Sequence, residues 1–451
     1  MLPPRIFLHC AWLAVAVAGC GPQVAVRSPS GFDNLRPARW VLTYPDFAGR
    51  IEVATARDAV YVTDCGDAFV LSRVDASGRF AWQRRLGQGC LSREHAVSIA
   101  ASDTGVVAAV PDRSGIRIVA FDPDGAQRWE RHLTSAVRAL SMAASPDRVA
   151  LCITAGSDAL DFEGTTLAVP TFGEVVVALD RQGARVATDI LLGASDASCA
   201  YDNTHQLWLT AHFGAGPITV HGVTRSVAAG TWAVRLGDAP RFVPLYQTES
   251  TFHTVVPAGF VVYRYQESLD FIDHDGQTRW HFDLTPRRGC WLGPHAIDAS
   301  PTHLLANLDV FCAERRGSAR FGDVEFEDQS APEDSIGSRD VLVELDPRTG
   351  KSRLVLDASG LPGKTSAAMN GGPSAELTYV GGSFGFIASG TFHGNLGLGT
   401  RIQSSPAVYE CRDNRPIDAW VHDDYRTDSP SCRSGHHLRT EYPTWAFISA
   451  F

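Results

Sequence analysis

Short runs of alternating apolar and polar residues fill most of this chain, and turn-forming Asp, Gly, Pro and Asn separate them. Alternation with a period of two residues predicts β-strands that bury one face. One strand–turn–strand unit recurs, as VLSRVDASGRFAWQRRLG at 70–87 and IVAFDPDGAQRWERHL at 118–133 illustrate. Further copies lie at 176–193, 269–284 and 342–357, and two less regular copies lie at 233–246 and 408–423. The pattern predicts a repeat protein made of β-sheets.

The recurring unit has a fixed pattern around its turn: an apolar strand, Asp-x-x-Gly, and a second strand with Trp four residues after the Gly. We expect the Asp side chain to accept hydrogen bonds from the following backbone amides and the Gly to supply the positive φ of a type I turn with a G1 bulge. The turn glycines are Gly78, Gly125, Gly183 and Gly276. Large rings at one equivalent strand position are expected to fill the wedge between neighbouring sheets, and these are Trp82, Trp129, Trp280 and Trp420.

A second recurring unit lies between these hairpins and consists of a strand, a polar turn and a strand. It occurs at 96–110, 139–153, 295–310 and 375–390. The full repeat therefore has four strands, and the steps from Asp75 to Asp413 average about 56 residues, which suits the four-stranded blade of a β-propeller. No segment of the body has sustained helical periodicity, so the predicted fold class is all-β.

Four-stranded sheets of this kind cannot bury both faces alone, whereas blades in a ring cover each other. We therefore expect a single β-propeller at 39–451 in preference to a β-sandwich array or two smaller domains. Seven units fit between Ile51 and Asp424. Strands predicted at 39–44 and 444–451 are expected to pair and close the ring. Seven blades are favoured, and eight are the main alternative.

Several units are lengthened by an insertion, in which a Phe/Val-x-Gly turn leads through a polar loop into the third strand. Insertions lie at 159–180, 217–236 and 319–346, with a looser instance at 394–411. These segments resemble the bacterial propeller lipoproteins with pyrroloquinoline-quinone-like (PQQ-like) or SBBP-type repeats, over essentially the whole mature chain. The resemblance implies the propeller architecture. It implies no single function, because enzymes, assembly factors and proteins of no known role share such repeats.

The N-terminus has the architecture of an export signal, with Arg5 as its only charge and an apolar run at 6–18. The run is shorter than the about 20 residues of a membrane-spanning helix, so we expect it to be removed. Val-Ala-Gly-Cys at 17–20 resembles the bacterial lipobox, which implies that Cys20 is diacylated and becomes the first mature residue. An ordinary signal peptide is the alternative. Gly21, in place of the Asp associated with inner-membrane retention, indicates the outer membrane.

The predicted organisation is a lipoprotein signal peptide at 1–19, the lipidated Cys20 with a Pro- and Ser-rich tether at 20–38, and the propeller at 39–451. No later segment has about 18 continuous apolar residues, so the lipid is the expected membrane contact. The formal net charge is −10 and Lys and Arg form no run. Phosphate binding needs clustered cations, so this balance argues against a nucleic-acid partner.

Ten cysteines are present, of which Cys10 lies in the signal and Cys20 is the lipidation site. The others are disulfide candidates, since an even number in an exported chain favours disulfides: Cys65, Cys90, Cys152, Cys199, Cys290, Cys312, Cys411 and Cys432. No CxxC pair occurs, so the cysteine spacing does not indicate a zinc site. Pairing between sequence neighbours is favoured, because the short loops at 65–90, 290–312 and 411–432 would each staple one blade or one blade junction.

Gly381-Gly382-Ser383-Phe384-Gly385 matches the G-x-S-x-G pattern of serine hydrolases. That nucleophile elbow needs a strand, a sharp turn and then a helix. The sequence at 386–392 continues as a strand, so we do not expect a catalytic serine there.

No metal site or cofactor is predicted. Asp122-Pro123-Asp124-Gly125 and Asp273-His274-Asp275-Gly276 resemble parts of a calcium loop, but the remaining ligands are missing and hairpin turns explain both. The pair His436-His437 is expected on a solvated loop. Isolated histidines are also assigned no metal, in the absence of an HExxH motif: His253, His295 and His303.

An acidic insertion at 323–328, followed by Glu333 and Asp334, would attract a cation or a basic partner. A solvated loop is the default interpretation of such a charge run.

The expected function is a non-catalytic binding or scaffold propeller at the cell envelope that engages a protein or a glycan through its loops. An alternative is an outer-membrane assembly factor similar to the propeller lipoprotein of the barrel assembly machinery. A further alternative is a quinone-dependent oxidoreductase, which in that family needs a catalytic Asp, a calcium-binding Glu/Asn set and often a disulfide between adjacent cysteines. No Cys-Cys pair occurs, so we expect no enzyme.

Overall fold

The computed structural model describes residues 39–44, 51–56, 58–65, 68–88, 98–112, 115–169, 173–247, 252–264, 267–284, 290–299, 304–312, 318–327, 337–357, 376–379, 386–392, 395–398, 401–404, 408–413, 436–441 and 445–450. Every regular element in these ranges is a β-strand. The predicted signal peptide, Cys20 and the tether lie outside them.

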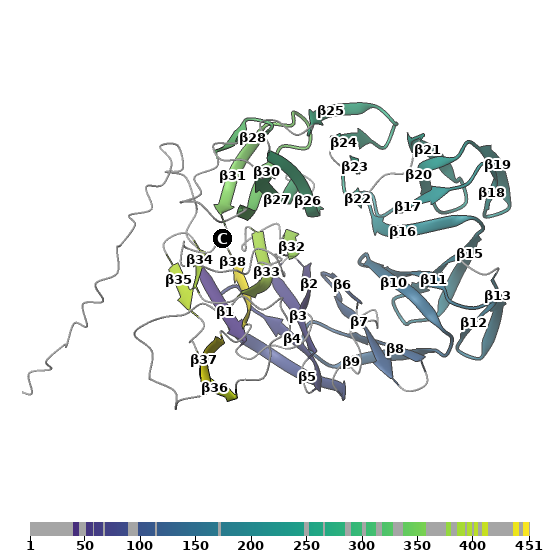
Figure 1. Cartoon of the computed structure of the whole chain (residues 1–451). Coiled ribbons are helices and arrows are strands. Elements are labelled where there is room, and N and C mark those ends of the chain that lie inside the picture. Colours follow the sequence, from purple (N-terminus) through teal and green to yellow (C-terminus); the bar gives the residue numbers. More distant parts are fainter. Residues whose placement is uncertain are drawn as a thin grey trace, which may run out of the picture. The chain divides into compact units, whose positions relative to one another are not determined.

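The described strands form larger sheets, named A to G in chain order (Figure 1). Sheet A has β2 (Ile51–Ala56), β3 (Ala59–Cys65), β4 (Ala68–Val74) and β5 (Phe80–Gln88). Sheet B has β6 (Ser98–Ser102), β7 (Gly105–Asp112), β8 (Gly115–Phe121), β9 (Gln127–Leu133) and, at its edge, β12 (Ala159–Phe162) and β13 (Thr165–Ala168). Sheet C has β10 (Val137–Ala144), β11 (Arg148–Ala155), β14 (Glu174–Asp180) and β15 (Arg185–Leu191).

Sheet D has β16 (Ala194–Tyr201), β17 (Leu207–Phe213), β20 (Gly230–Arg235) and β21 (Arg241–Tyr246). Sheet E has β22 (Phe252–Val256), β23 (Gly259–Arg264), β24 (Ser268–Asp273) and β25 (Thr278–Asp283). Sheet F has β26 (Cys290–Ala299), β27 (Leu304–Cys312), β30 (Gly337–Leu345) and β31 (Ser352–Asp357). Sheet G has β32 (Glu376–Tyr379), β33 (Phe386–Phe392), β38 (Trp445–Ala450) and β1 (Trp40–Tyr44).

The remaining described strands form two-stranded pairs. They are β18 (Gly216–Val220) with β19 (Val223–Val227), β28 (Ser318–Phe321) with β29 (Val324–Glu327), β34 (Asn395–Leu398) with β35 (Arg401–Ser404), and β36 (Val408–Asp413) with β37 (His436–Glu441).

The sheets are antiparallel meanders that close on themselves. In sheet G the N-terminal strand β1 pairs with the C-terminal strand β38, with Trp40 opposite Ala450 and Tyr44 opposite Ala446. The first strands of successive sheets contact each other in the order β2, β6, β10, β16, β22, β26, β32 and back to β2. This is the topology of a β-propeller. The predicted all-β propeller of four-stranded blades and its closure by the terminal strands are confirmed.

The hairpin predicted at 408–423 is wrong. β36 pairs with β37, and the third and fourth strands of sheet G are β38 and β1. The reason is the closure: the last sheet takes its outer strands from the two ends of the chain, so the copy at 408–423 is not needed to complete it. Trp420 lies outside the described residues. His436 and His437, predicted on a loop, begin strand β37.

The Asp-x-x-Gly turns have the predicted geometry. Oδ1 of Asp122 accepts hydrogen bonds from the backbone N–H groups of Asp124 at 3.0 Å and Ala126 at 2.8 Å. Gly125 has a φ of 82°, and the β8–β9 register shifts after Ala120, as a G1 bulge requires. The turn at 273–276 repeats the arrangement, with Oδ1 of Asp273 accepting from two backbone amides. The first carboxylate of each calcium-like fragment therefore serves its own hairpin, whereas Asp275 pairs with Arg241 of sheet D at 2.9 Å.

Tryptophans join successive sheets through these turns. Nε1 of Trp82 in sheet A donates to the carbonyl of Pro123 in sheet B at 2.9 Å, and Nε1 of Trp129 in sheet B donates to the carbonyl of Arg181 in sheet C at 3.1 Å. Trp280 in sheet E repeats the contact with sheet F through the carbonyl of Pro347 at 3.1 Å. Each indole thus fills the wedge beside the next sheet with its polar atom satisfied, as predicted.

The turn glycine is what lets each indole approach. A Cβ added at Gly125 would lie 2.8 Å from the Trp82 ring, and one added at Gly183 would lie 2.6 Å from the Trp129 ring. Gly276 meets no tryptophan, because its neighbour on sheet D is Val243, at 3.2 Å. The glycine therefore serves two sheets, by closing its own turn and by receiving the ring of the preceding sheet.

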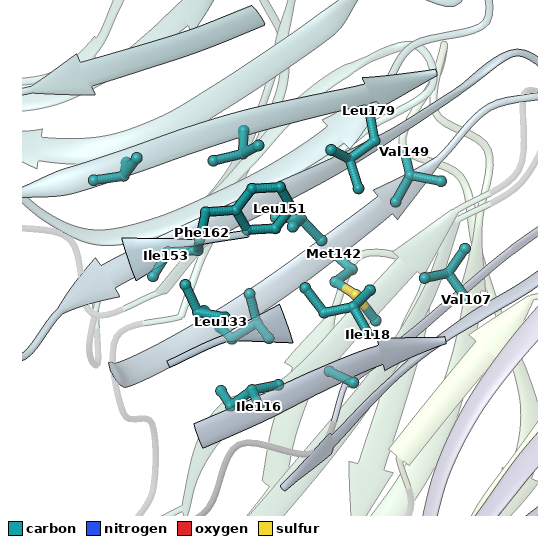
Figure 2. Close-up of a cluster of buried hydrophobic side chains, with 14 of the residues drawn as sticks. Val107, Ile116, Ile118, Leu133, Met142, Val149, Leu151, Ile153, Phe162 and Leu179 are labelled. Atoms are coloured by element: carbon teal, nitrogen blue, oxygen red, sulfur yellow. The ribbon is translucent and has the colours of Figure 1, made fainter. Parts of the chain in front are cut away.

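Apolar side chains fill the space between the sheets. Figure 2 shows one such cluster, in which Ile118 and Leu133 of sheet B meet Leu151 and Leu179 of sheet C. All four are fully buried. Phe162 of β12 joins the cluster, so the inserted hairpin is part of the core. Each such side chain stabilises the fold by about 1.5–3 kcal/mol.

The predicted insertions form hairpins that cover the outer strand of the preceding sheet. β12 pairs with β9 at Phe162 and Leu133, and β18 and β34 contact β15 and β31. In the β28–β29 insertion, the ring centroid of Phe321 on β28 lies 5.0 Å from that of Phe282 on β25. The first part of the acidic insertion is therefore a strand and not the solvated loop that we expected. Val324 and Phe326 are buried while Asp323 and Glu325 are exposed, because a strand presents alternate residues to opposite faces. Asp328, Glu333 and Asp334 lie outside the described residues.

The two ends of each sheet differ in what they carry. In an antiparallel meander, the turns between first and second strands and between third and fourth strands lie at the same end, which we call the turn end. Connections between second and third strands lie at the other end. The insertion hairpins follow second strands, as β12–β13 follows β11, so they leave from the end opposite to the turn end.

Gly183→Ala should lower the free energy of unfolding by about 1–3 kcal/mol, because the new Cβ meets the Trp129 ring in an overpacked site. Urea unfolding followed by tryptophan fluorescence measures the loss. Gly164→Ala is the matched control, since Gly164 has a similar φ of 72° but no neighbour within 4 Å of an added Cβ. Equal losses in the two variants would mean that the indole contact contributes nothing.

Candidate functional site

Sheet A departs from the other sheets at one position of the repeat. The second residue before the turn Asp is Arg73, and its register partner on β3 is Tyr61. The equivalent pairs are apolar in three other sheets: Ala120 with Val107 in sheet B, Ala178 with Ala150 in sheet C, and Phe271 with Val261 in sheet E. Sheet F has Glu344 opposite Leu305. An arginine and a tyrosine thus stand where sheets B, C and E have apolar pairs.

A cleft of about 270 Å³ opens between sheets A and B beside this pair. Sheet A contributes Ala56, Asp58, Ala59, Tyr61 and Arg73, and sheet B contributes Ser102, Asp103 and Pro123. Asp58 and Asp103 lie in the turns after β2 and β6, so the cleft is at the turn end. The corresponding space between sheets B and C, beside Val107 and Ala120, is about 20 Å³, which is room for about one water molecule.

The hydrogen bond that joins sheets A and B also fixes one wall of the cleft. Pro123 lines the cleft and also accepts the hydrogen bond from Trp82. The Trp82 ring lies 6.0 Å from the ring of Tyr61 and 6.0 Å from that of Phe121. Tyr61 is 1% exposed. The aromatic side chains therefore form a packed floor below the polar groups.

Charges of both signs meet in the cleft. Among the described residues, Nε of Arg73 is buried without a hydrogen-bond acceptor. Burial raises the pKa of Tyr61 above its ordinary value, and the nearby guanidinium of Arg73 partly opposes that rise. Tyr61 is therefore a neutral hydroxyl at physiological pH. The carboxylates of Asp58 and Asp103 are exposed at the mouth, so the cleft offers donors from Arg73 and acceptors from the two aspartates.

A second polar cluster lies in sheet E. The hydroxyl of Ser268 donates to Oδ2 of Asp270 at 2.8 Å, and Nδ1 of His281 lies 2.7 Å from Oδ1 of the same carboxylate. The serine therefore contacts the carboxylate and not the imidazole. Nucleophilic catalysis needs the serine hydroxyl on the imidazole, so this cluster is not an activated nucleophile.

Sheets D and E are joined by a different contact. Trp208 of β17 is fully buried and donates from Nε1 to Oδ2 of Asp202 at 2.9 Å. The His274 ring, from the β24–β25 turn, stacks on Trp208 with 5.0 Å between centroids and 9° between planes. Burial lowers the pKa of His274, although the charges of Asp202 and Asp273 act in the opposite direction. At this junction Val243 faces the turn glycine Gly276, and the stacked rings of Trp208 and His274 supply the aromatic contact.

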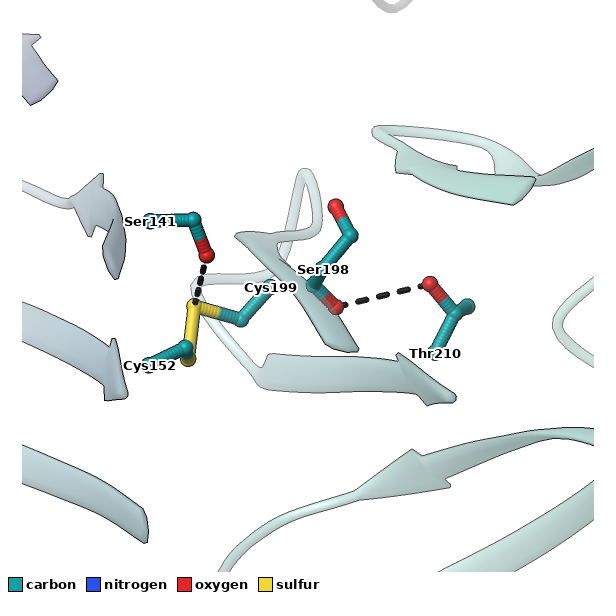
Figure 3. The surroundings of a disulfide bond; sticks show 5 residues. All are labelled: Ser141, Cys152, Ser198, Cys199 and Thr210. Atoms are coloured by element: carbon teal, nitrogen blue, oxygen red, sulfur yellow. Dashed lines mark hydrogen bonds between the residues drawn. A yellow bond between two sulfur atoms is a disulfide. The ribbon is translucent and has the colours of Figure 1, made fainter. Parts of the chain in front are cut away.

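The disulfide candidates are only partly within the described residues. Cys152 on β11 and Cys199 on β16 are joined, with 6.4 Å between their Cα atoms, so the pairing of sequence neighbours holds here and staples sheet C to sheet D (Figure 3). Cys290 is also disulfide-bonded, and its register partner is Cys312. Cys65 lies on β3 and Cys411 on β36. Cys20, Cys90 and Cys432 lie outside the described residues.

The other predicted residues are not brought together as a site. Gly381–Gly385 lies outside the described residues, and the next segment is strand β33, as expected. Within the described ranges, no group of three or more His, Cys, Asp or Glu side chains is placed to hold a metal ion. The same part of the chain contains no helix long and apolar enough to cross a membrane.

Sequence reasoning missed the pair of Arg73 and Tyr61. An alignment of the repeat copies shows that position 73 is unusual. VLSRVD at 70–75 has Arg where IVAFD at 118–122 and VVALD at 176–180 have Ala. The partner on β3 is not visible in that alignment, since its identity depends on strand register. Only the register places Tyr61 beside Arg73.

Comparison with known proteins finds no matching family model and no matching curated protein. Among solved structures, the chain is similar to BamB from Moraxella catarrhalis, with 14% identity, 70% of this chain and 98% of that chain covered, and a TM-score of 0.36. It is similar to the Dos1 propeller, with 10% identity, 82% and 94% coverage and a TM-score of 0.40. It is also similar to TolB from Acinetobacter baumannii, with 14% identity, 70% and 65% coverage and a TM-score of 0.35. Likenesses this distant carry no argument about function, so the propeller assignment rests on strand order and closure.

The stack of His274 on Trp208 predicts a loss of stability in acid. As pH falls below about 6.5, the unfolded chain binds a proton at His274 before the folded protein does, because the folded pKa is lowered. The contribution of His274 to the free energy of unfolding is thus complete above the pKa that its imidazole has in the unfolded chain. It falls as pH drops toward the pKa of the imidazole in the folded protein. His274→Phe keeps a ring on Trp208 and should reduce the slope of unfolding free energy against pH between about 7.5 and 5.5. An unchanged slope would contradict the assignment.

Proposed function

We propose that this chain is a lipid-anchored binding propeller of the cell envelope, with no catalytic activity of its own. The observation that carries the binding role is the cleft between sheets A and B, where Arg73 and Tyr61 replace the apolar pairs found at the equivalent positions of sheets B, C and E. Unlike Arg84, which donates to the carbonyl of Gly125 at the same junction, Arg73 has a buried Nε without an acceptor among the described residues, and a buried donor left unsatisfied costs the fold free energy.

We propose seven blades for the ring. The first strands of sheets A to G follow one another in a closed cycle, which favours one blade for each sheet. Sheet B is the sheet that departs from four strands. Its strands β6 to β9 have the same order as the blade strands elsewhere, and β12–β13 is an insertion hairpin added to its edge.

The rigidity of the junctions supports a role in binding. Indole hydrogen bonds across the sheet junctions fix the turns that line the cleft, so a ligand meets preorganised groups. Binding residues on loops that a rigid scaffold positions are a common arrangement. The cleft also has the concave form and the few convergent polar groups of small-molecule sites.

The groups of the cleft favour binding over catalysis. Burial raises the pKa of Tyr61, so its hydroxyl stays protonated. Asp58 and Asp103 are exposed at the mouth, where water stabilises their charge. This set lacks the nucleophile and adjacent base of covalent catalysis.

The anchor is proposed from the sequence. Val-Ala-Gly-Cys at 17–20 and the apolar run before it favour lipidation of Cys20, and Gly21 favours the outer membrane. Two or three acyl chains hold a protein firmly, since each buried methylene contributes about 0.8 kcal/mol. The tether at 20–38 would then separate the propeller from the bilayer surface.

Cys20→Ser should abolish labelling with palmitate. It should also leave residues 1–19 attached, because lipidation precedes cleavage, and intact mass reports this. Cys10→Ser is the matched control and should behave as the wild type, since Cys10 lies inside the removed segment. Palmitate labelling that persists in Cys20→Ser would refute the anchor.

The absence of catalysis has a separate test. Pyrroloquinoline quinone with calcium, added to the purified full-length protein, should change neither its absorbance spectrum nor the rate of dye reduction with alcohols or sugars as donors. Dye reduction above the background would refute the non-catalytic role. Co-purification of barrel-assembly subunits from membranes would favour the assembly-factor alternative.

A further inference from the structure

The cleft between sheets A and B contains a charged side chain that the fold itself does not require. Ala120 and Ala178 occupy the equivalent of position 73 in sheets B and C and pack there without a charged group. At Arg73 the chain instead buries the Nε group, which finds no acceptor among the described residues. Buried donors are normally satisfied, so an acceptor supplied by a ligand would complete the site.

The balance of charge in the cleft restricts the ligand. A simple anion that approached Arg73 would meet the carboxylates of Asp58 and Asp103, and a simple cation that approached those carboxylates would meet Arg73. A neutral molecule rich in hydroxyl groups satisfies both, because each hydroxyl donates one hydrogen bond and accepts others. Carboxylates accept from such hydroxyls and the guanidinium donates to their oxygens.

The size and the remaining surface of the cleft agree with a small polyhydroxylated ring. Pockets for drug-sized ligands occupy roughly 300–1,000 Å³. The cleft, at about 270 Å³, is just below that range. Ala56, Ala59 and Pro123 line it with apolar surface, against which the C–H groups of a ring can pack.

We propose that the cleft between sheets A and B binds a neutral saccharide, with Arg73 donating to ring or hydroxyl oxygens and with Asp58 and Asp103 accepting from hydroxyl groups. This proposal rests on the proposed function as a binding propeller and names the class of ligand. The corresponding space between sheets B and C is too small for a saccharide, because it has room for about one water molecule.

Saturation-transfer difference NMR on the full-length protein in a mild non-glycosidic detergent tests the proposal with glucose, galactose, mannose, N-acetylglucosamine and maltose at millimolar concentrations. At least one of these sugars should show transfer, and Arg73→Ala should abolish it. Arg73→Lys should weaken it about tenfold or more, since the ammonium lacks the planar fork of the guanidinium. Asp58→Asn and Asp103→Asn should each weaken binding, because an amide is a poorer acceptor than a carboxylate.

The matched control is Arg185→Ala, which removes an exposed arginine from β15 of sheet C, away from the cleft, and should leave the transfer unchanged. Thermal unfolding of Arg73→Ala should remain cooperative with a midpoint no lower than that of the wild type, since Ala occupies this position in two other sheets. A melting midpoint well below the wild type would mean that Arg73 is there to stabilise the junction, which would overturn the proposal.

Two further outcomes would also overturn it. Sugar binding that survives Arg73→Ala would place the saccharide elsewhere. Transfer to arginine or acetate probes, with none to the sugars, would refute the ligand class. A negative sugar screen leaves the palmitate result untouched, and a failed palmitate test leaves the sugar result untouched, so the two proposals fail separately.

Discussion

At the junctions of sheets A with B, B with C and E with F, the structure depends on one contact, in which the indole of one sheet lies beneath the turn glycine of the next. The glycine lacks the Cβ that would meet the ring at 2.6–2.9 Å, and the indole N–H is satisfied by a carbonyl of the same turn. An Arg two residues after the Trp adds a hydrogen bond to that glycine's carbonyl in sheets A and B. Turn geometry within a sheet and packing between sheets are therefore set by the same few atoms.

The candidate cleft is a local departure built on this contact. Trp82 and Pro123 hold sheets A and B together as elsewhere, and the residues beside them differ. Arg73 and Tyr61 leave a cleft of about 270 Å³, whereas Ala120 and Val107 leave about 20 Å³ at the next junction. The residue before the tryptophan also differs between the two junctions. Arg128 of sheet B donates to the carbonyls of Thr104 and Arg181 beside the smaller space, whereas sheet A has Ala81 at the equivalent position.

The junction of sheets D and E shows that the wedge can be filled in another way. Here the copy of the hairpin at 233–246 has no tryptophan past its turn, and His274 stacks on Trp208 instead. This junction therefore contains a ring that titrates, beside an indole whose N–H is satisfied within sheet D. The insertion hairpins add a further layer, because they bury the outer strand of the sheet before them and extend the apolar core outward, as Phe162 does.

The sequence by itself determined the strands, the Asp-x-x-Gly turns, the tryptophan position and the closure by terminal strands, because each is a local or repeated pattern. It also favoured the bond between Cys152 and Cys199. Only the tertiary structure decided that β36 pairs with β37, that the insertion hairpins lie on the preceding sheet, and that Tyr61 faces Arg73. These outcomes depend on register and on neighbours distant in the chain, and a pattern with a period of two residues does not encode which strand lies beside which.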